Sequence, residues 1–216
     1  IRDSIGSRAV IRNARELVWY PSEVDTSIRT GWFYHPEEDT DVRTAGELLD
    51  IYLDAVGANA SLLLNIPPDT HGRIAAPDCA SLTELGTKIQ QIFADSVTEK
   101  AKITADSAIA QHPITQAVDG MANTYWQAAY GQKSDTITLK FPKPQKVSCV
   151  VLGEHLPTGQ RIESGEIWAD GSKVAEFTVV GHKRICRFAP VDVQTLTIKI
   201  TASRTEPTLR LLEVYQ

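Results

Sequence analysis

The stretch WYPSEVDTSIRTGWFYH, from Trp19 to His35, holds two of the four Trp together with two carboxylates and an Arg, in a span too short to be a domain. Its apolar beginning, residues 17–20, predicts a buried strand. If the extended conformation continues, Glu23 and Asp25, two residues apart, project to one face. Aromatic rings cover the C–H faces of a sugar, while carboxylates and Arg bind its hydroxyls. The stretch therefore fits a sugar site or a strand and turn packed into a core, and both interpretations stay open.

Helix signals follow this stretch. The acidic residues 36–39 are expected to begin a helix, with carboxylates at the positive end of its dipole. Apolar residues recur at helical spacing over residues 42–56, and Gly57 ends the run. Asn59 stands in a glycosylation-type sequence, but it is expected to cap the end of this helix instead. A second helix is predicted over residues 77–93.

Between the two helices, residues 61–66 form a continuous apolar run that is stopped by two Pro. Such a run is typical of a parallel strand covered on both faces. Strand, helix, strand, helix is the repeat of an α/β barrel, in which chemistry sits at the C-terminal ends of the strands. Two such units cannot close eight strands, so the pattern predicts that part of a barrel lies outside this chain.

The composition shifts at residues 95–100, and beyond them the helical pattern disappears. Short runs, many of them alternating, are separated there by Gly, Pro and Asp, which predicts an all-β sandwich. We therefore expect two domains, an α/β unit over residues 1–97 and a β-sandwich over residues 98–216.

Composition excludes several classes of function. A net charge of −5 and a pI near 5.6 give no basic face for nucleic acid, and no stretch approaches the length of a membrane span. Three Cys are too few for a disulfide framework or a zinc site. Of these, Cys149 and Cys186 lie in expected strands, either as buried free thiols or as a pair, and buried thiols are the expectation.

Residues 19–39, followed by ELLDIYLDAVGANASLLLNIPPDTHGRI at residues 47–74, resemble the late part of the catalytic barrel of family 29 glycoside hydrolases, the retaining α-L-fucosidases. They are most similar to the subfamily that removes branched α-1,3/1,4-linked fucose. The resemblance, which runs over about residues 5–92, implies the distal portion of a (β/α)8-like barrel. It also implies exo-acting hydrolysis of fucosylated oligosaccharides with retention, and a secreted or periplasmic enzyme that needs no cofactor for catalysis.

The family's two catalytic motifs are not in this chain. The nucleophile is an Asp in a Trp-(Phe/Leu)-Asp-Gly context, and the acid/base Glu follows a Gly-Asn pair; both belong upstream of the resembling region. Trp168-Ala169-Asp170-Gly171 imitates the first motif, but Asp-Gly between two alternating runs is a hairpin signal. We therefore expect no catalytic residue here and an N-terminal segment of the same enzyme as partner. The alternative is a non-catalytic glycan-binding protein.

The resemblance also implies substrate-binding residues. Trp32 matches a Trp that lines the fucose site, where its ring would cover the C5 methyl group. Tyr34 could line the same site or simply pack, and His35 could bond a sugar hydroxyl or cap the loop. Glu23 is expected to be a positioning residue near the pocket. Arg29 is expected either to orient a carboxylate or to contact the rest of the oligosaccharide.

Residues 116–126, followed downstream by residues 154–161 and 204–215, resemble the discoidin or family 32 carbohydrate-binding fold, a sandwich of galactose-binding type. In many relatives the turn before Trp126 and a Glu near the C-terminus hold a structural Ca²⁺ through oxygen ligands. Trp126 itself is expected in the core, with a sugar-stacking platform as the alternative. A turn satisfied by its own hydrogen bonds is the alternative to the Ca²⁺ site. The matching positions for Ca²⁺ are Asp119, Asn123, Thr124 and Glu213.

Overall fold

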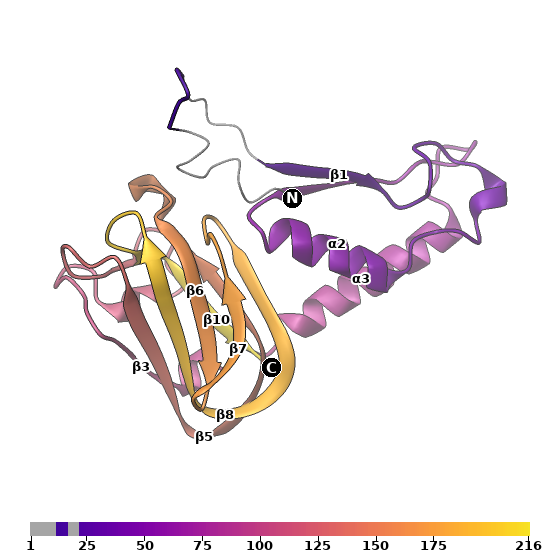
Figure 1. Cartoon of the computed structure of the whole chain (residues 1–216). Coiled ribbons are helices and arrows are strands. Elements are labelled where there is room, and N and C mark those ends of the chain that lie inside the picture. Colours follow the sequence, from indigo (N-terminus) through magenta and orange to yellow (C-terminus); the bar gives the residue numbers. More distant parts are fainter. Residues whose placement is uncertain (1–11, 17–21) are drawn as a thin grey trace.

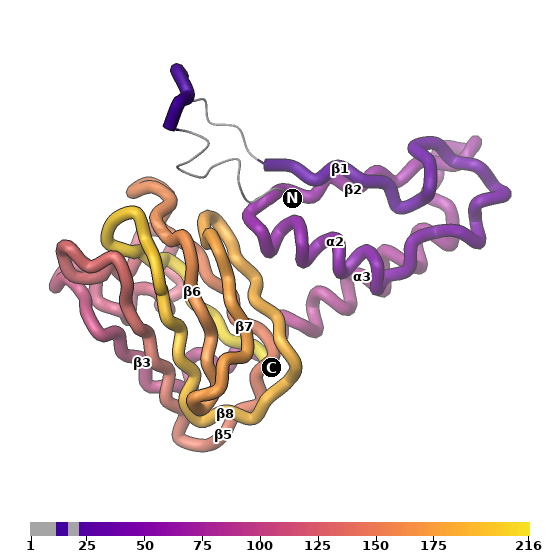
Figure 2. The backbone as a smooth tube through the Cα atoms, viewed as in Figure 1, coloured from indigo at the N-terminus to yellow at the C-terminus, as the bar shows by residue number. Residues whose placement is uncertain are grey.

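The computed structural model describes residues 12–16 and 22–216 (Figure 1). The strand expected at residues 17–20, and with it Trp19, lies outside the described residues. The first described strand is β1 (Glu23–Ser27). The chain forms a small α/β unit followed by a larger β unit, and the two lie side by side in both views (Figures 1 and 2).

The α/β unit consists of two parallel strands and two helices. Strand β1 pairs with β2 (Ser61–Asn65), which aligns the two strands end to end. Helix α2 (Ala45–Val56) packs against β2 and against α3 (Ala76–Ile92). The order strand, helix, strand, helix is therefore confirmed.

The beginning of α2 was predicted wrongly. The acidic residues form only a short 3-10 helix, η1 (Pro36–Glu38), and α2 starts later. The reason is a capping box: the Thr44 side chain accepts from the Glu47 backbone N–H, and the Glu47 carboxylate accepts from the Thr44 backbone N–H. These reciprocal bonds satisfy two orphan amides and fix the start of the helix at Ala45.

The two-stranded sheet is covered on one face, not on both as expected. Ile28, at the end of β1, is fully buried against α2 and α3, and Leu64 packs with it. The opposite face is exposed: Asp25 and its cross-strand partner Leu63 both reach solvent, and Leu63 is 52% exposed. Among the described residues nothing covers this face.

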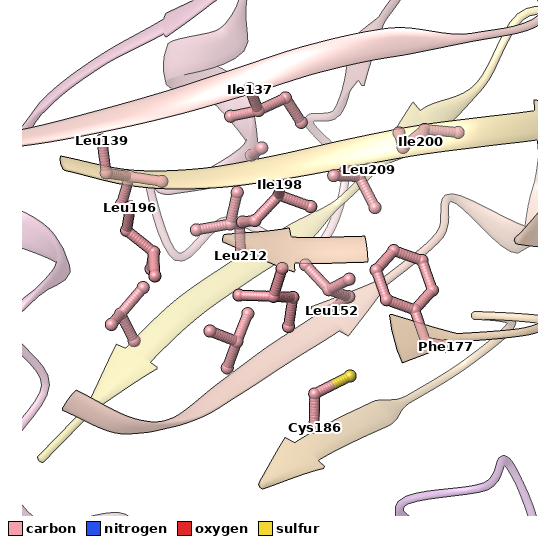
Figure 3. Close-up of a cluster of buried hydrophobic side chains, with 14 of the residues drawn as sticks. Ile137, Leu139, Leu152, Phe177, Cys186, Leu196, Ile198, Ile200, Leu209 and Leu212 are labelled. Atoms are coloured by element: carbon pink, nitrogen blue, oxygen red, sulfur yellow. The ribbon is translucent and has the colours of Figure 1, made fainter. Parts of the chain in front are cut away.

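The β unit is a sandwich with one dominant core. Its main sheet has the order β10-β5-β8-β6-β7, and β3 pairs with the first half of β5 on the edge that β10 occupies further along. β4 pairs with β9 in a second, small sheet. Figure 3 shows part of the cluster of buried hydrophobic side chains that forms this core. The elements are η2 (Thr98–Lys100), β3 (Lys102–Ala105), η3 (Ile114–Ala117), β4 (Trp126–Gln127), β5 (Asp135–Gly153), η4 (Leu156–Thr158), β6 (Ile162–Ala169), β7 (Ser172–Phe177), β8 (Arg184–Ser203), β9 (Thr208–Leu209) and β10 (Leu211–Tyr215).

Side-chain alternation separates the two buried thiols. Val150 on β5 is paired with Cys186 on β8, and both face the main core. Cys149 therefore points to the opposite side of the sheet, into a smaller cluster with Tyr215. Both Cys are free, which confirms the expected buried thiols and excludes the pair.

A third hydrophobic cluster joins the two units. Phe93, just after α3, meets Tyr215 edge to face with ring centroids 5.3 Å apart. On the other side of the junction, the backbone N–H of Ile185 donates to the Gly57 carbonyl at 3.0 Å. The α/β unit thereby covers part of the free edge of β8, so the units are packed together as well as tethered.

Candidate functional site

The loop that carries Trp32 is tied to the C-terminal ends of both parallel strands. The Asn65 side-chain amide donates to the Ser27 hydroxyl and to the Trp32 carbonyl, both at 3.1 Å. The Ser27 hydroxyl in turn donates to the Gly31 carbonyl at 2.7 Å. These bonds fix the backbone while the Trp32 ring remains 52% exposed and Phe33 77% exposed. A large aromatic surface is thus held open to solvent at the end of β1.

Arg29 holds the far side of the same loop. Its side chain is fully buried, and its Nε donates to Asp78 Oδ2 at 3.1 Å while Nη2 lies 2.9 Å from Asp78 Oδ1. Nη2 also binds Asp39 at 2.7 Å, and Nη1 donates to the His35 carbonyl at 3.2 Å. The guanidinium lies 4.8 Å from the centroid of the Tyr34 ring, within cation–π range. One side chain therefore connects β1, the loop and the first turn of α3.

The predicted site residues fall into different places. Trp32 and His35 are exposed on the loop, and Tyr34 is half-buried against Arg29. The buried Arg29 guanidinium has no exposed surface for a sugar, which favours the first of its two predicted roles, orienting a carboxylate. Glu23 is exposed at the other end of β1, about 13 Å along the strand from Ser27, so the strand does not bring it to the loop.

Two residues of this arrangement were missed in the sequence. Asp78 stands in the first turn of α3, where an acidic residue is already favoured by the helix dipole, so nothing in the pattern marks it as the partner of Arg29. Asp39 belongs to the acidic run at residues 36–39, which predicts the start of a helix and gives no sign of a partner for Arg29. Asn65 is easier to find from the sequence, because it ends an apolar strand on the side where the sites of barrels lie.

The predicted Ca²⁺ ligands do not assemble into one site. The Asp119 carboxylate is bound by the Thr124 hydroxyl, at 2.9 and 2.8 Å, and by the Met121 backbone N–H. Leu212 on β10 faces the main core, so the neighbouring Glu213 points to the opposite side of the sheet, towards the junction with the α/β unit. Among the described residues no cluster of three or more His, Cys, Asp or Glu could hold a metal. Asn123 is exposed in the turn, which its own hydrogen bonds satisfy.

Trp126 lies in the core, as expected. Its ring is fully buried, and its Nε1 donates to the Ser107 carbonyl at 3.0 Å. The hairpin predicted at Asp170-Gly171 is also present: both residues have positive φ, 45° and 85°, and they join β6 to β7. Asp170 accepts from the backbone of the neighbouring strand β8, which makes it a turn residue. In the described part of the chain, no helix has the length and apolar character needed to cross a membrane.

Each part of the chain matches a known protein-family model. Residues 10–91 match the family model for α-L-fucosidase, and residues 96–210 match that of a domain of unknown function (DUF7402). The chain belongs to the DUF7402 family, and its first part is similar to α-L-fucosidases. α-L-Fucosidase 1 of Arabidopsis thaliana is 31% identical over 209 residues, covering 91% of this chain and 41% of the relative. The chain thus spans about 40% of the length of the curated relatives it matches.

Solved structures that are described as fucosidases share the fold of both parts of this chain. A Ruminococcus gnavus GH29 fucosidase in complex with fucose superposes with a TM-score of 0.83 at 28% identity, over 92% of this chain and 41% of that one. A structure from Bacteroides thetaiotaomicron, provisionally described as an α-L-fucosidase, gives a TM-score of 0.87 at 30% identity over 92% of this chain and 45% of that one. The fold of most of this chain therefore recurs as a part of longer proteins.

Proposed function

We propose that this chain is the C-terminal part of a retaining, exo-acting α-L-fucosidase that removes α-1,3/1,4-linked fucose from fucosylated oligosaccharides. The observation that carries the proposal is the α-L-fucosidase match over residues 10–91, which includes the exposed Trp32 loop at the carboxyl end of β1. Hydrolysis with retention needs two carboxyl groups about 5 Å apart, one as nucleophile and one as acid and then base. We assign both to an N-terminal segment outside this chain.

The bare face of the β1–β2 sheet supports such a segment. Parallel sheets are almost always covered on both faces, and two strands alone are marginally stable. Here the described residues cover one face only and leave Asp25 and Leu63 in solvent. Neither strand has a second neighbour among the described residues. Further strands added at these edges would extend the two βα units into a (β/α)8 barrel whose interior is the bare face.

Within that barrel the residues of the loop take distinct roles. Trp32 offers a ring to the apolar face of fucose, and His35 and Tyr34 lie beside it with polar atoms for the hydroxyls. Arg29 is a positioning residue, because its guanidinium donates to the His35 carbonyl and packs on the Tyr34 ring. Glu23, at the start of β1, would contribute from inside the barrel, away from the loop.

The proposal is tested with the full-length polypeptide, with this chain alone and with the two segments mixed. We expect aryl α-L-fucoside turnover by the full-length protein, no turnover by the chain alone, and recovery when the N-terminal segment is added. Product NMR should show α-L-fucose first, because the reaction retains configuration. Turnover by the chain alone would overturn the assignment of the catalytic carboxylates. An inactive full-length protein that still binds fucosylated glycan would favour the alternative, a non-catalytic glycan-binding protein.

Three further expectations belong to the same proposal. An enzyme that acts on glycans outside the cell would be secreted or periplasmic. The DUF7402 domain, which we expect to resemble carbohydrate-binding sandwiches, would then contribute glycan contacts of its own. A Ca²⁺ ion is not assigned to it, because Asp119 is bonded by Thr124 within its own turn and Glu213 points to the junction with the α/β unit.

A further inference from the structure

Two imidazoles sandwich a phenol ring in the β-sandwich. The Tyr125 ring stacks on His112 with centroids 3.9 Å apart and planes at 21°, and on His155 at 3.9 Å and 7°. His112 precedes η3, Tyr125 precedes β4 and His155 follows β5, so three separate loops build the stack. None of these residues takes part in the Trp32 site.

Hydrogen bonds fix the proton position on both imidazoles. Gln116 Nε2 donates to the Gln111 carbonyl at 3.2 Å, so Gln116 Oε1 accepts from His112 Nδ1 at 3.1 Å. The Thr158 hydroxyl donates to the His155 carbonyl at 2.8 Å, so its oxygen accepts from His155 Nδ1 at 3.3 Å. In each neutral imidazole the proton therefore sits on Nδ1, and Nε2 carries a lone pair.

The outer polar atoms of the stack are open to solvent. Nε2 of His112, Nε2 of His155 and Oη of Tyr125 make no hydrogen bond with the described residues. None of the three is among the buried polar atoms that lack a partner, so each is accessible. The stack thus has three polar atoms that are not fully buried and have no partner among the described residues.

Hydrogen bonds place two Arg next to His155. Arg161 Nε donates to the carbonyl of Thr158, whose hydroxyl bonds His155 Nδ1, and the Arg210 backbone N–H donates to the Gly153 carbonyl. Burial and the charges of His112, Arg161 and Arg210 lower the pKa of His155, burial being the largest cause. Arg161 donates from Nε and Nη1 to the carbonyls of Thr158 and Glu206, which leaves Nη2 without a described partner. Arg210 makes no side-chain hydrogen bond or ion pair with the described residues.

Nearby carboxylates do not cancel this charge. Glu154 is buried and accepts three backbone N–H bonds, from Arg161 and Ile162 and from Gly181. Those bonds direct its oxygens into the protein. Glu206 stands beside Arg161, and its carboxylate is held by the Gly131 N–H and the Thr205 hydroxyl. Neither Arg210 nor the two imidazoles form an ion pair with a described carboxylate.

We propose that the stack His112–Tyr125–His155, together with Arg161 and Arg210, binds an oxyanion, that is a sulfate, phosphate or carboxylate group, free or borne by a larger ligand. The guanidinium groups donate charge-assisted hydrogen bonds to its oxygens, and the Tyr125 hydroxyl donates another. Protonation of His155 adds an Nε2–H donor while its Nδ1–H bond to Thr158 is kept. The site is independent of fucoside hydrolysis and of the Trp32 loop.

The proposal fixes the sign of the pH dependence. An anion beside His155 favours the imidazolium, so binding raises the pKa of His155 above its value in the free protein. Proton uptake is therefore linked to binding, and affinity increases as the pH falls through the imidazole range. A rise of one pKa unit corresponds to about tenfold tighter binding to the protonated protein.

Histidine side-chain NMR of the full chain tests the proposal. Sodium sulfate is titrated against sodium chloride at equal ionic strength, and galactose 6-sulfate against galactose. We expect sulfate to raise the pKa of His155 and chloride to leave it unchanged. Tighter binding of galactose 6-sulfate than of sulfate assigns a glycan-borne anion, and equal binding assigns the free ion. Galactose binding as well as its sulfate ester, or no response to any probe, would overturn the oxyanion site.

Substitutions provide an independent readout. Arg210→Gln should weaken sulfate binding about tenfold through the loss of a charged donor, and His155→Gln should abolish the pH dependence. Arg187→Gln is the matched control, because Arg187 is exposed on β8 away from the stack, and it should change the affinity less than twofold. Equal loss of affinity in Arg210→Gln and Arg187→Gln would show a diffuse charge effect and contradict the proposal.

Discussion

The guanidinium of Arg29 and the carboxylate of Asp78 form a completely buried ion pair, with Nε 3.1 Å from Oδ2 and Nη2 2.9 Å from Oδ1. The pair links the end of β1 to the first turn of α3, two segments 49 positions apart. A paired Arg presents two donors in a rigid fork, which a Lys cannot do. The loop that carries Trp32 and His35 therefore depends on a connection in the interior of the α/β unit.

Breaking this pair should destabilise the α/β unit strongly. Removing one partner of a buried ion pair typically costs about 3–5 kcal/mol, and Asp39, which also binds Arg29 Nη2, should keep the cost at the lower end of that range. We expect Asp78→Asn to lower the free energy of unfolding by an amount in that range, as measured by urea denaturation. Arg29→Lys should lower the free energy of unfolding by less than Asp78→Asn does, since Lys keeps the positive charge and loses only the fork of two donors. Asp54→Asn, on the exposed surface of α2, serves as the control. Equal stability of Asp78→Asn and this control would contradict the role of the pair.

Asn65→Ala should displace the Trp32 loop with little effect on overall stability. The substitution removes two hydrogen bonds, one to the Ser27 hydroxyl and one to the Trp32 carbonyl. Misplacing a substrate-contacting ring by about 1 Å can cost on the order of a hundredfold in rate. We expect kcat/KM of the full-length protein for an aryl α-L-fucoside to fall by about ten- to a hundredfold. Asn123→Ala, in an exposed turn, should leave the activity unchanged. Unaltered kcat/KM in Asn65→Ala would exclude a role of the loop in catalysis.

The sequence allowed the alternation of strands and helices to be predicted, because each element shows its own period. It could not reveal the partners of Arg29, since Asp39 and Asp78 are ordinary acidic residues near helix starts and only the fold brings them together. Strand lengths were not predicted correctly either. Two of the short runs expected in the second domain, at residues 137–141 and 146–152, form a single strand, β5. Its regular pairing with β8 is interrupted between Lys140 and Gln145. Two Pro occupy this interruption, where no ladder hydrogen bond is lost.

Gly181→Ala should loosen the junction between the two units. Gly181 has φ of 61°, and an added Cβ would lie 2.5–2.9 Å from the Asn59 side chain. Asn59 cannot simply rotate away, because its Oδ1 accepts from the His182 N–H at 2.6 Å. We expect a loss of about 2–3 kcal/mol, combining a backbone cost of roughly 1–2 kcal/mol with the clash. Gly171→Ala isolates the backbone cost, since its φ is 85° and nothing lies within 4 Å of the added Cβ. Equal losses in the two variants would mean that the junction adapts without strain.

Stability in acid should depend on Glu206. The Thr205 hydroxyl, as the largest cause, and the Gly131 N–H lower the pKa of Glu206 from 4.5 to about 2. A carboxyl group whose pKa is lower in the folded state stabilises the fold fully above its ordinary pKa, and this contribution is lost as the pH falls through the folded-state value. Glu206→Gln should therefore lower the Tm at pH 7 and make little difference near pH 2. Glu99→Gln, at an exposed position of η2, should show no such pH-dependent difference. A Tm difference between wild type and Glu206→Gln that stays constant from pH 7 to pH 2 would mean that the Glu206 charge does not hold this loop.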